Sequence, residues 1–180
     1  MCCKATCALS TLALILLILS FVLDISGCFS GMWYLTGGKQ TILWSEISVV
    51  IYGSIWGDCV SSEYFSKCES KDTDWLKAVR AFSISGFVFF FVAIVVVIVH
   101  LCFKHKTKAM YITTICITCA GAICAMIAFV LYAVYATGNE REFFIGFYIT
   151  IVAFAFGILA GMLESINLIK TNTGKVEAIH

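Results

Sequence analysis

Residues 82–99 read FSISGFVFFFVAIVVVIV, a run of eighteen positions without a charged side chain. A helix of that length rises about 27 Å, close to the roughly 30 Å of hydrocarbon in a bilayer. A soluble domain has little use for an uninterrupted apolar run of this length. The segment therefore predicts a helix that crosses a membrane.

Three further apolar runs accompany this one, and none shows the period-2 polarity of a barrel strand. We expect an all-α transmembrane four-helix bundle, with spans at about residues 8–27, 81–102, 109–136 and 143–168. The chain is 61% hydrophobic and 13% charged, with a mean hydropathy of +0.99, which is more apolar than one modest soluble core requires. The net charge of +1 argues against nucleic acid as a partner, so the lipid bilayer is the predicted environment. Cleavage of the first run as a signal peptide is the alternative, although its apolar stretch is longer than a usual signal core.

Charge placement predicts how the four spans are oriented. Lysines gather before the first span, in the short connection KHKTK (104–108) and in the tail at 170–180. The long segment 29–77 instead carries four lysines against six acids, a formal charge of −2. By the positive-inside rule both termini lie in the cytosol, while the large loop 28–80 and the short loop 137–142 lie outside.

The large outer loop is predicted to fold as a small antiparallel β-sheet closed by a disulfide. It is rich in Trp, Tyr, Ile and Val, with a glycine pair at 37 and 38 suited to a turn. Cys59 and Cys68 lie in this loop, in an oxidising compartment, and we predict that they are bridged. Cys28, at the end of the first helix, is an alternative partner for either one. The loop tryptophans Trp33, Trp44 and Trp56 have interfacial anchoring as their simplest role.

The same loop carries a family resemblance. The residues Trp33, Ser54, Ile55, Trp56, Cys59, Cys68 and Arg80 resemble the W…GLW…C…C…R signature of the claudin superfamily. The stretches DWLKAVRAFSIS (74–85) and MYITTICITCAGAICA (110–125) resemble its peripheral-myelin and epithelial-membrane-protein branch. The resemblance covers nearly the whole chain and implies that the first helix is retained. Ser54 replaces the usual glycine, and the tail ends KVEAIH, without the hydrophobic end that many claudins offer to PDZ scaffolds.

The resemblance also implies candidate functional residues. In pore-forming claudins the residue after the second cysteine can line the paracellular path, and here that position is Glu69, with Asp58 and Glu63 close by in sequence. Superfamily members often carry lipids on cysteines beside the membrane, which makes Cys2, Cys3, Cys7 and Cys102 candidates for palmitoylation.

Two charges near the outer ends of the first two helices are candidates for an ion pair. Asp24 and Arg80 have opposite signs and similar expected depth, and a shared contact costs less than two separately buried charges. Independent snorkelling to water is the alternative.

No arrangement of residues predicts catalysis, a metal site or a cofactor, so we do not expect an enzyme. We expect a claudin-like structural protein of cell–cell contacts at the plasma membrane, contributing to adhesion or a paracellular barrier. It would act through a homo-oligomer or related four-span proteins in the same and the apposed membrane. The alternatives are an auxiliary subunit of a channel or receptor, and a myelin-protein-like membrane organiser without a sealing role.

Overall fold

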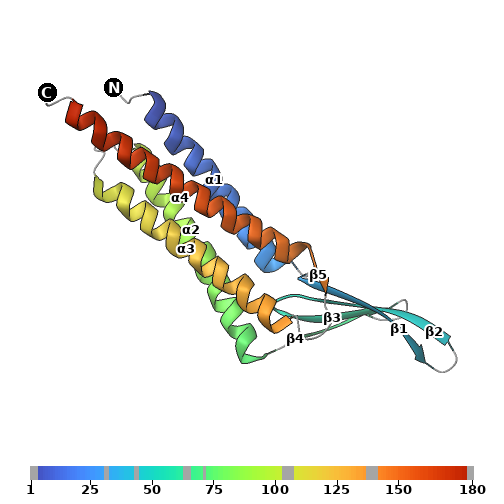
Figure 1. Cartoon of the computed structure of the whole chain (residues 1–180). Helices are drawn as coiled ribbons and strands as arrows, with labels where there is room; N and C mark the ends of the chain where they lie inside the picture. The colour runs from blue at the N-terminus through green and yellow to red at the C-terminus, as the bar shows by residue number, and fades with distance from the viewer. Residues whose placement is uncertain are drawn as a thin grey trace.

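Four long helices form the body of the protein in this computed structural model, which describes residues 4–30, 33–42, 45–62, 66–70, 72–102, 108–136 and 142–177 (Figure 1). The helices are α1 (Lys4–Phe29), α2 (Asp74–Cys102), α3 (Lys108–Ala136) and α4 (Ile145–Glu177). Each contains a segment long and apolar enough to cross a membrane. The predicted four-span bundle is therefore confirmed.

The helices are neighbours in a ring, since α1 packs on α2 and α4, and α3 packs on the same two helices. Small residues let the backbones approach: Gly27 faces Thr150, and a Cβ at Gly157 would stand 2.8 Å from the ring of Phe90. The bundle interior holds a cluster that includes Leu17 and Phe90, both fully buried. Large apolar side chains also cover the outward faces of the described helices, as expected of surfaces that contact lipid.

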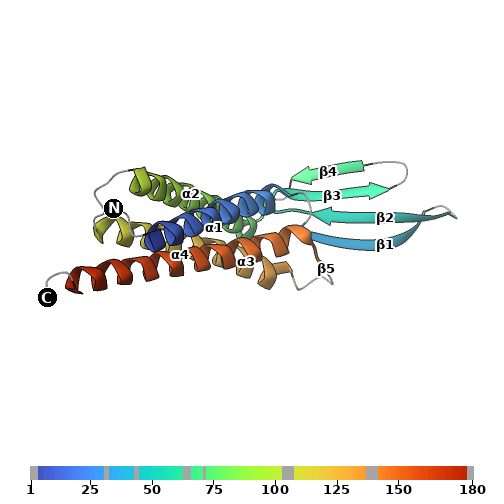
Figure 2. The same ribbon diagram turned by 90° about the horizontal axis from the view of Figure 1, so that it is seen from above.

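A five-stranded antiparallel sheet continues beyond one end of the bundle (Figure 2). Its strands are β1 (Tyr34–Ile42), β2 (Ser45–Gly53), β3 (Gly57–Ser62), β4 (Ser66–Ser70) and β5 (Glu142–Phe143), in the order β4-β3-β2-β1-β5. Four strands come from the segment between α1 and α2, where the sequence predicts a sheet. The fifth comes from the short connection between α3 and α4, where no strand was expected. Its two residues pair with Tyr34 and Leu35.

Several helices extend beyond their predicted spans: α1 by a few residues at each end, and α2 and α4 by two turns or more at one end. α2 begins at Asp74, so residues 74–80, assigned to the outer loop from sequence, form its first two turns. The carbonyl of Thr73 accepts bonds from the amides of Leu76 and Lys77, each at 3.0 Å, and Asp74 adds a negative charge at the positive helix end. α4 likewise continues to Glu177 through most of the predicted tail. A search for apolar runs does not detect helix ends that are polar.

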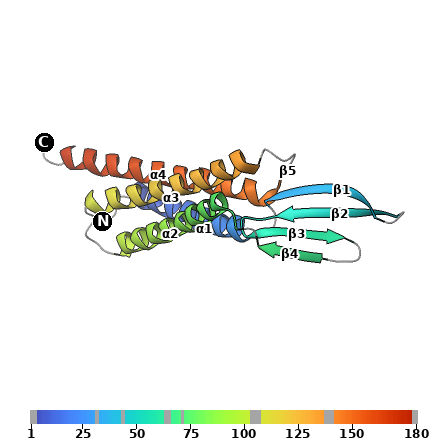
Figure 3. The same ribbon diagram turned by 90° about the horizontal axis from the view of Figure 1, so that it is seen from below.

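Both termini lie at the end of the bundle away from the sheet (Figure 3). We call the opposite end of the bundle, where the strands leave it, the sheet end. Four candidate spans in the described residues are an even number, which the expected placement of both termini on one side of a membrane requires.

Candidate functional site: the junction between bundle and sheet

Trp33 lies at the centre of the junction, between α1 and β1. Its side chain is fully buried, and its indole N–H donates to the carbonyl of Gly27 at 2.6 Å. Its backbone N–H donates to Gly53 at 2.7 Å, and its carbonyl accepts from the amide of Phe144 at 2.9 Å. The ring packs edge-on against Tyr132, with centroids 4.7 Å apart. Trp33 is therefore a core residue that joins the helices to the sheet, and interfacial anchoring does not describe it.

The second tryptophan completes a cap on α1. A helix C-terminus leaves its last carbonyls without partners inside the helix. The indole N–H of Trp33 donates to the carbonyl of Gly27. The indole N–H of Trp56 donates to the next carbonyl, that of Cys28, at 2.8 Å. Two tryptophans distant in sequence thus satisfy consecutive backbone oxygens of one helix end, which fixes where the loop returns to α1.

The Ser54-Ile55-Trp56 segment forms the tight connection between β2 and β3. The Ser54 amide donates to the carbonyl of Gly57 at 2.9 Å, and the Ser54 hydroxyl accepts from the amide of Trp56 at 3.1 Å. Ile55 is fully buried in the cluster at the sheet end. A Cβ at Gly57 would stand 2.5 Å from the backbone oxygen of Glu69, so the close approach of the paired strands β3 and β4 excludes a larger residue there. The serine, which departs from the family's usual glycine, supplies a hydrogen bond that glycine lacks.

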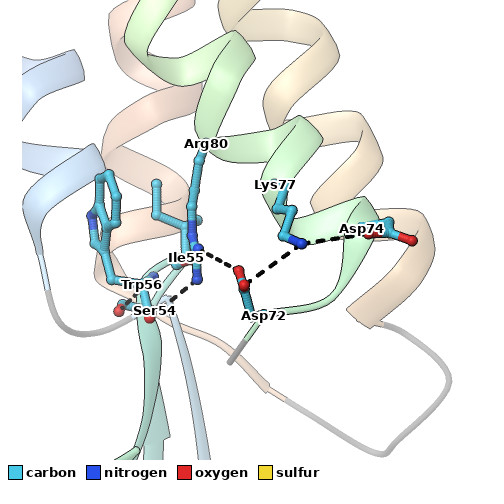
Figure 4. Close-up of polar contacts among 7 residues, drawn as sticks. All are labelled: Ser54, Ile55, Trp56, Asp72, Asp74, Lys77 and Arg80. Carbon is cyan, nitrogen blue, oxygen red and sulfur yellow. Dashed lines mark hydrogen bonds and ion pairs between the residues drawn. The ribbon is translucent and has the colours of Figure 1, made fainter. Parts of the chain in front are cut away.

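Arg80 ties α2 to this connection (Figure 4). Its Nε donates to the carbonyl of Ile55 at 2.7 Å, and its two terminal nitrogens lie 3.2 Å from the carbonyl oxygen of Trp56 and 3.3 Å from Asp72 Oδ1. The guanidinium carbon also lies 5.5 Å from the centre of the Trp56 ring. Lys77 Nζ is 3.6 Å from Asp72 Oδ2, so the carboxylate of Asp72 faces two bases. The planar guanidinium suits this role because it offers several donors at fixed angles.

The predicted ion pair between Asp24 and Arg80 is wrong. Arg80 donates to backbone carbonyls and to Asp72, while among the described residues neither oxygen of Asp24 has a hydrogen-bond partner. Asp24 is fully buried, and its Oδ2 lies against Gly86, six positions beyond Arg80 along α2. Six residues of helix rise about 9 Å, so the two charges lie at different depths. The shared depth on which the pairing rested does not exist.

The disulfide joins Cys59 and Cys68, which face each other across β3 and β4. Cys28, the alternative partner, is a buried free thiol in α1. The bridge lies within the sheet, where it links the edge strand β4 to its neighbour.

Two of the three predicted acids come together. Asp58 on β3 pairs in register with Glu69 on β4, and both line a depression of about 330 Å³ with Ser70 and Asp72. Glu63 lies outside the described residues, as does Trp44.

Two of the four candidate lipidation sites, Cys7 and Cys102, lie in described helices, at the end of the bundle away from the sheet. Cys102 is exposed at the last residue of α2. Cys7 lies in the first turn of α1, and Cys2 and Cys3 lie outside the described residues. No cluster of three or more His, Cys, Asp or Glu side chains suited to a metal ion occurs in the part of the chain that the structure describes.

The sequence did not predict which groups accept the hydrogen bonds at the junction. The acceptors of Trp33, Trp56 and Arg80 are carbonyl groups, which every residue carries and no motif marks. The signal in the sequence was the resemblance of Trp33, Trp56 and Arg80 to the claudin signature. That signal identified the donors and left their acceptors open.

Four membrane-crossing helices with a disulfide-linked sheet anchored at one end define a class of multi-pass membrane protein with a folded loop between its first two spans. The model of the PMP-22/EMP/MP20/Claudin family matches residues 29–164, which is most of the chain. The chain belongs to this family of membrane proteins of junction and myelin type. A search of the curated proteins gives no match to an individual relative.

Proposed function

We propose that the protein is a structural component of contacts between cells, with its sheet outside the plasma membrane and both termini in the cytosol. Family membership and the lysine-rich short connection and tail support this orientation. The observation that carries the proposal is the junction itself. It fixes a folded sheet to the membrane-spanning helices, so the sheet can present one defined surface to a neighbour.

Side-by-side association would use the sheet and the helices together. β4 is an edge strand whose five residues are all exposed, and an open edge offers unpaired backbone groups to a second chain. The apolar outward faces of the helices would pack against the same neighbour in lipid. We propose a homo-oligomer, or assembly with related four-span proteins, in one membrane, with sheets of apposed membranes meeting at their tips.

Two further elements belong to this proposal. Acyl chains on Cys102, Cys7, Cys2 and Cys3 would favour ordered regions of the membrane without altering the fold. Asp58 and Glu69, which pair across β3 and β4, would give a modest preference for cations if assembled chains form a path between cells.

The test is expression in cells that lack junction strands, followed by freeze-fracture imaging and measurement of electrical resistance across the monolayer. Strands with raised resistance support a barrier role. Clustering at contacts without strands supports the myelin-like organiser, and altered gating of a co-expressed channel supports the auxiliary subunit. Failure to concentrate at cell contacts contradicts the proposal.

The junction provides the matched variants for this experiment. Arg80→Ala removes the hydrogen bonds to the carbonyls of Ile55 and Trp56. Lys77 lies on the same helix, and Lys77→Ala removes only its exposed ion pairs with Asp72 and Asp74. We expect contact localisation to fall with the first variant and to persist with the second. Equal localisation of both, at equal surface expression, would show that the orientation of the sheet does not matter for contacts.

A further inference from the structure

The ends of α3 and α4 away from the sheet carry two exposed lysines at one level. Gly161 on α4 faces Thr118 on α3, since a Cβ at Gly161 would stand 3.7 Å from the methyl carbon of Thr118. Lys170 follows Gly161 by nine residues of helix, which rise about 14 Å. Lys108 precedes Thr118 by ten residues, which rise about 15 Å in the same direction. Because α3 packs on α4, these two exposed side chains lie at one depth on neighbouring helices.

Both lysines lie where the apolar part of their helix ends. The segment of α3 that is able to cross a membrane begins at Lys108, and that of α4 ends at Lys170. α4 itself continues to Glu177, about 10 Å farther. The headgroup layer on one side of a bilayer is about 5–8 Å thick. Lys108 and Lys170 therefore lie at the inner edge of a headgroup layer, and the end of α4 passes through it.

Each lysine lies one turn outward of an exposed isoleucine. Ile112 follows Lys108 by four residues, and Ile166 precedes Lys170 by four. Residues four apart share one face of a helix. Each face thus combines a cation at the boundary with apolar surface just inside it. A phospholipid offers the complementary pair, a charged headgroup above acyl chains.

Two more lysines belong to the layer beyond this boundary. Asn167 on α4 donates to the hydroxyl of Ser10 on α1 at 3.0 Å, which sets the level of one helix against the other. Toward the chain termini, Lys4 lies about 9 Å beyond Ser10, and Lys175 lies about 12 Å beyond Asn167 (Figure 3). The positions of Lys4 and Lys175 therefore differ in depth by only about 3 Å.

The end of the bundle away from the sheet has an excess of positive charge. Six lysines and two glutamates, a formal charge of +4, occur in residues 1–23, 100–108 and 164–180. Glu164 is buried, and about 9 Å of helix separates it from Lys170. The connections at the sheet end, residues 29–80 and 137–142, instead carry a formal charge of −2. The charge at the level of Lys108 and Lys170 is therefore complementary to an anion.

We propose that Lys108 and Lys170 bind the headgroup of an anionic phospholipid, and we call these two residues the lysine rim. Lys4 and Lys175 add to the attraction from deeper in the headgroup layer. The acyl chains of the same lipid would lie against the exposed isoleucines, which favours a lipid over a soluble phosphate. Placing this end in the cytosol rests on the proposed function, and the cytosolic leaflet is the one rich in anionic lipids.

The test is the lipid selectivity of the purified full chain in phosphatidylcholine vesicles. Electron spin resonance of spin-labelled phosphatidylserine and spin-labelled phosphatidylcholine gives the ratio of their association constants with the protein. One lysine near an anionic headgroup contributes a factor of about five, so we expect a ratio of about five or more at low salt. The ratio should fall in 0.5 M sodium chloride, because salt screens the attraction. A ratio of one at low salt overturns the proposal.

Paired variants assign the selectivity to the lysine rim. Lys108→Gln combined with Lys170→Gln removes both charges and should lower the ratio at least threefold. Lys67→Gln combined with Lys77→Gln removes two exposed lysines from the sheet end and is the matched control. The control should keep the ratio of the wild type. A ratio that is unchanged by the first pair places the attraction on other residues and contradicts the assignment.

Inorganic phosphate distinguishes a lipid from a phosphate ion. At constant ionic strength, replacing millimolar chloride by phosphate should leave the association of spin-labelled phosphatidylserine unchanged. Displacement of the labelled lipid by phosphate would show a site for the ion and overturn the proposal. These vesicle measurements involve no cell contacts, so a ratio of one counts against the lysine rim and not against the proposed function.

Discussion

Arg80 and Asp24 both lie in the half of the bundle nearest the sheet, and their surroundings differ. Arg80 donates to two carbonyls and a carboxylate at the junction, where side chains reach solvent. Asp24, farther from the sheet, faces a glycine backbone and apolar neighbours. A depth difference of about 9 Å separates Arg80, which is hydrogen-bonded to the connection between β2 and β3, from Asp24, whose oxygens have no hydrogen-bond partner among the described residues. In this bundle, the depth of a charged side chain determines whether polar groups of the loop are within hydrogen-bonding distance.

The largest expected effect is at the buried centre of the junction. Trp33→Ala should cost about 3–5 kcal/mol of unfolding free energy, because it removes a fully buried ring together with a helix cap. Trp33→Phe retains much of the packing and should cost about 1–2 kcal/mol. Unfolding in mixed detergent micelles measures both. A cost below about 1 kcal/mol for Trp33→Ala would show that the ring is not part of the core.

The disulfide should contribute slightly less. Its ring closes over a sequence separation of 9, and loop-closure entropy predicts about 3 kcal/mol. We expect Cys59→Ser to lower stability by that amount and to reduce delivery to the cell surface. Non-reducing mass spectrometry should find Cys59 linked to Cys68 in the wild type and in Cys28→Ser, the control. A linked peptide containing Cys28 would contradict the structure.

The comparison between the two charges can be tested directly by double-mutant cycles. Arg80→Ala should cost about 2 kcal/mol through lost charge-assisted bonds, and Arg80→Lys should recover only part of this cost. Coupling to Asp72→Ala should be about 0.5–1 kcal/mol, since the two side chains are in contact at 3.3 Å. Coupling to Asp24→Asn should stay below about 0.5 kcal/mol. A larger value in the Asp24 cycle would place the two charges in one network after all.

The smallest expected effect concerns the acids on the sheet. Glu69→Gln should lower a sodium-over-chloride preference modestly in a monolayer that forms strands, since exposed carboxylates are screened over about 8 Å at physiological salt. Asp58→Asn should act in the same direction because it is the cross-strand neighbour of Glu69. Asp74→Asn, an exposed acid at the start of α2, is the control. Dilution potentials report the ratio, and an unchanged ratio in Glu69→Gln would remove this residue from the path.

The sequence alone determined the four helices, the sheet in the first loop and the residue types of the junction. The length of an apolar run is a local property of the sequence. The thickness of the bilayer sets the length that a spanning helix needs, whatever the fold around it. Trp33 and Arg80 were identifiable as candidates from the family signature. Their partners were not, since these are backbone carbonyls fixed only when the loop returns to the end of α1 and the start of α2.

Only the tertiary structure decided the relative depth and rotation of the helices. These helices are apolar on nearly all sides, so periodicity along one helix does not say which face turns inward or which residues of two helices lie level. That is why Asp24 was matched to Arg80 when it lies beside Gly86, and why β5 was missed, since a two-residue strand exists only where β1 provides its partner. Glycines mark the close approaches: Gly86 leaves room for the carboxylate of Asp24, and Gly27 lets the end of α1 lie against Gly146 and Thr150 at the start of α4, just after β5.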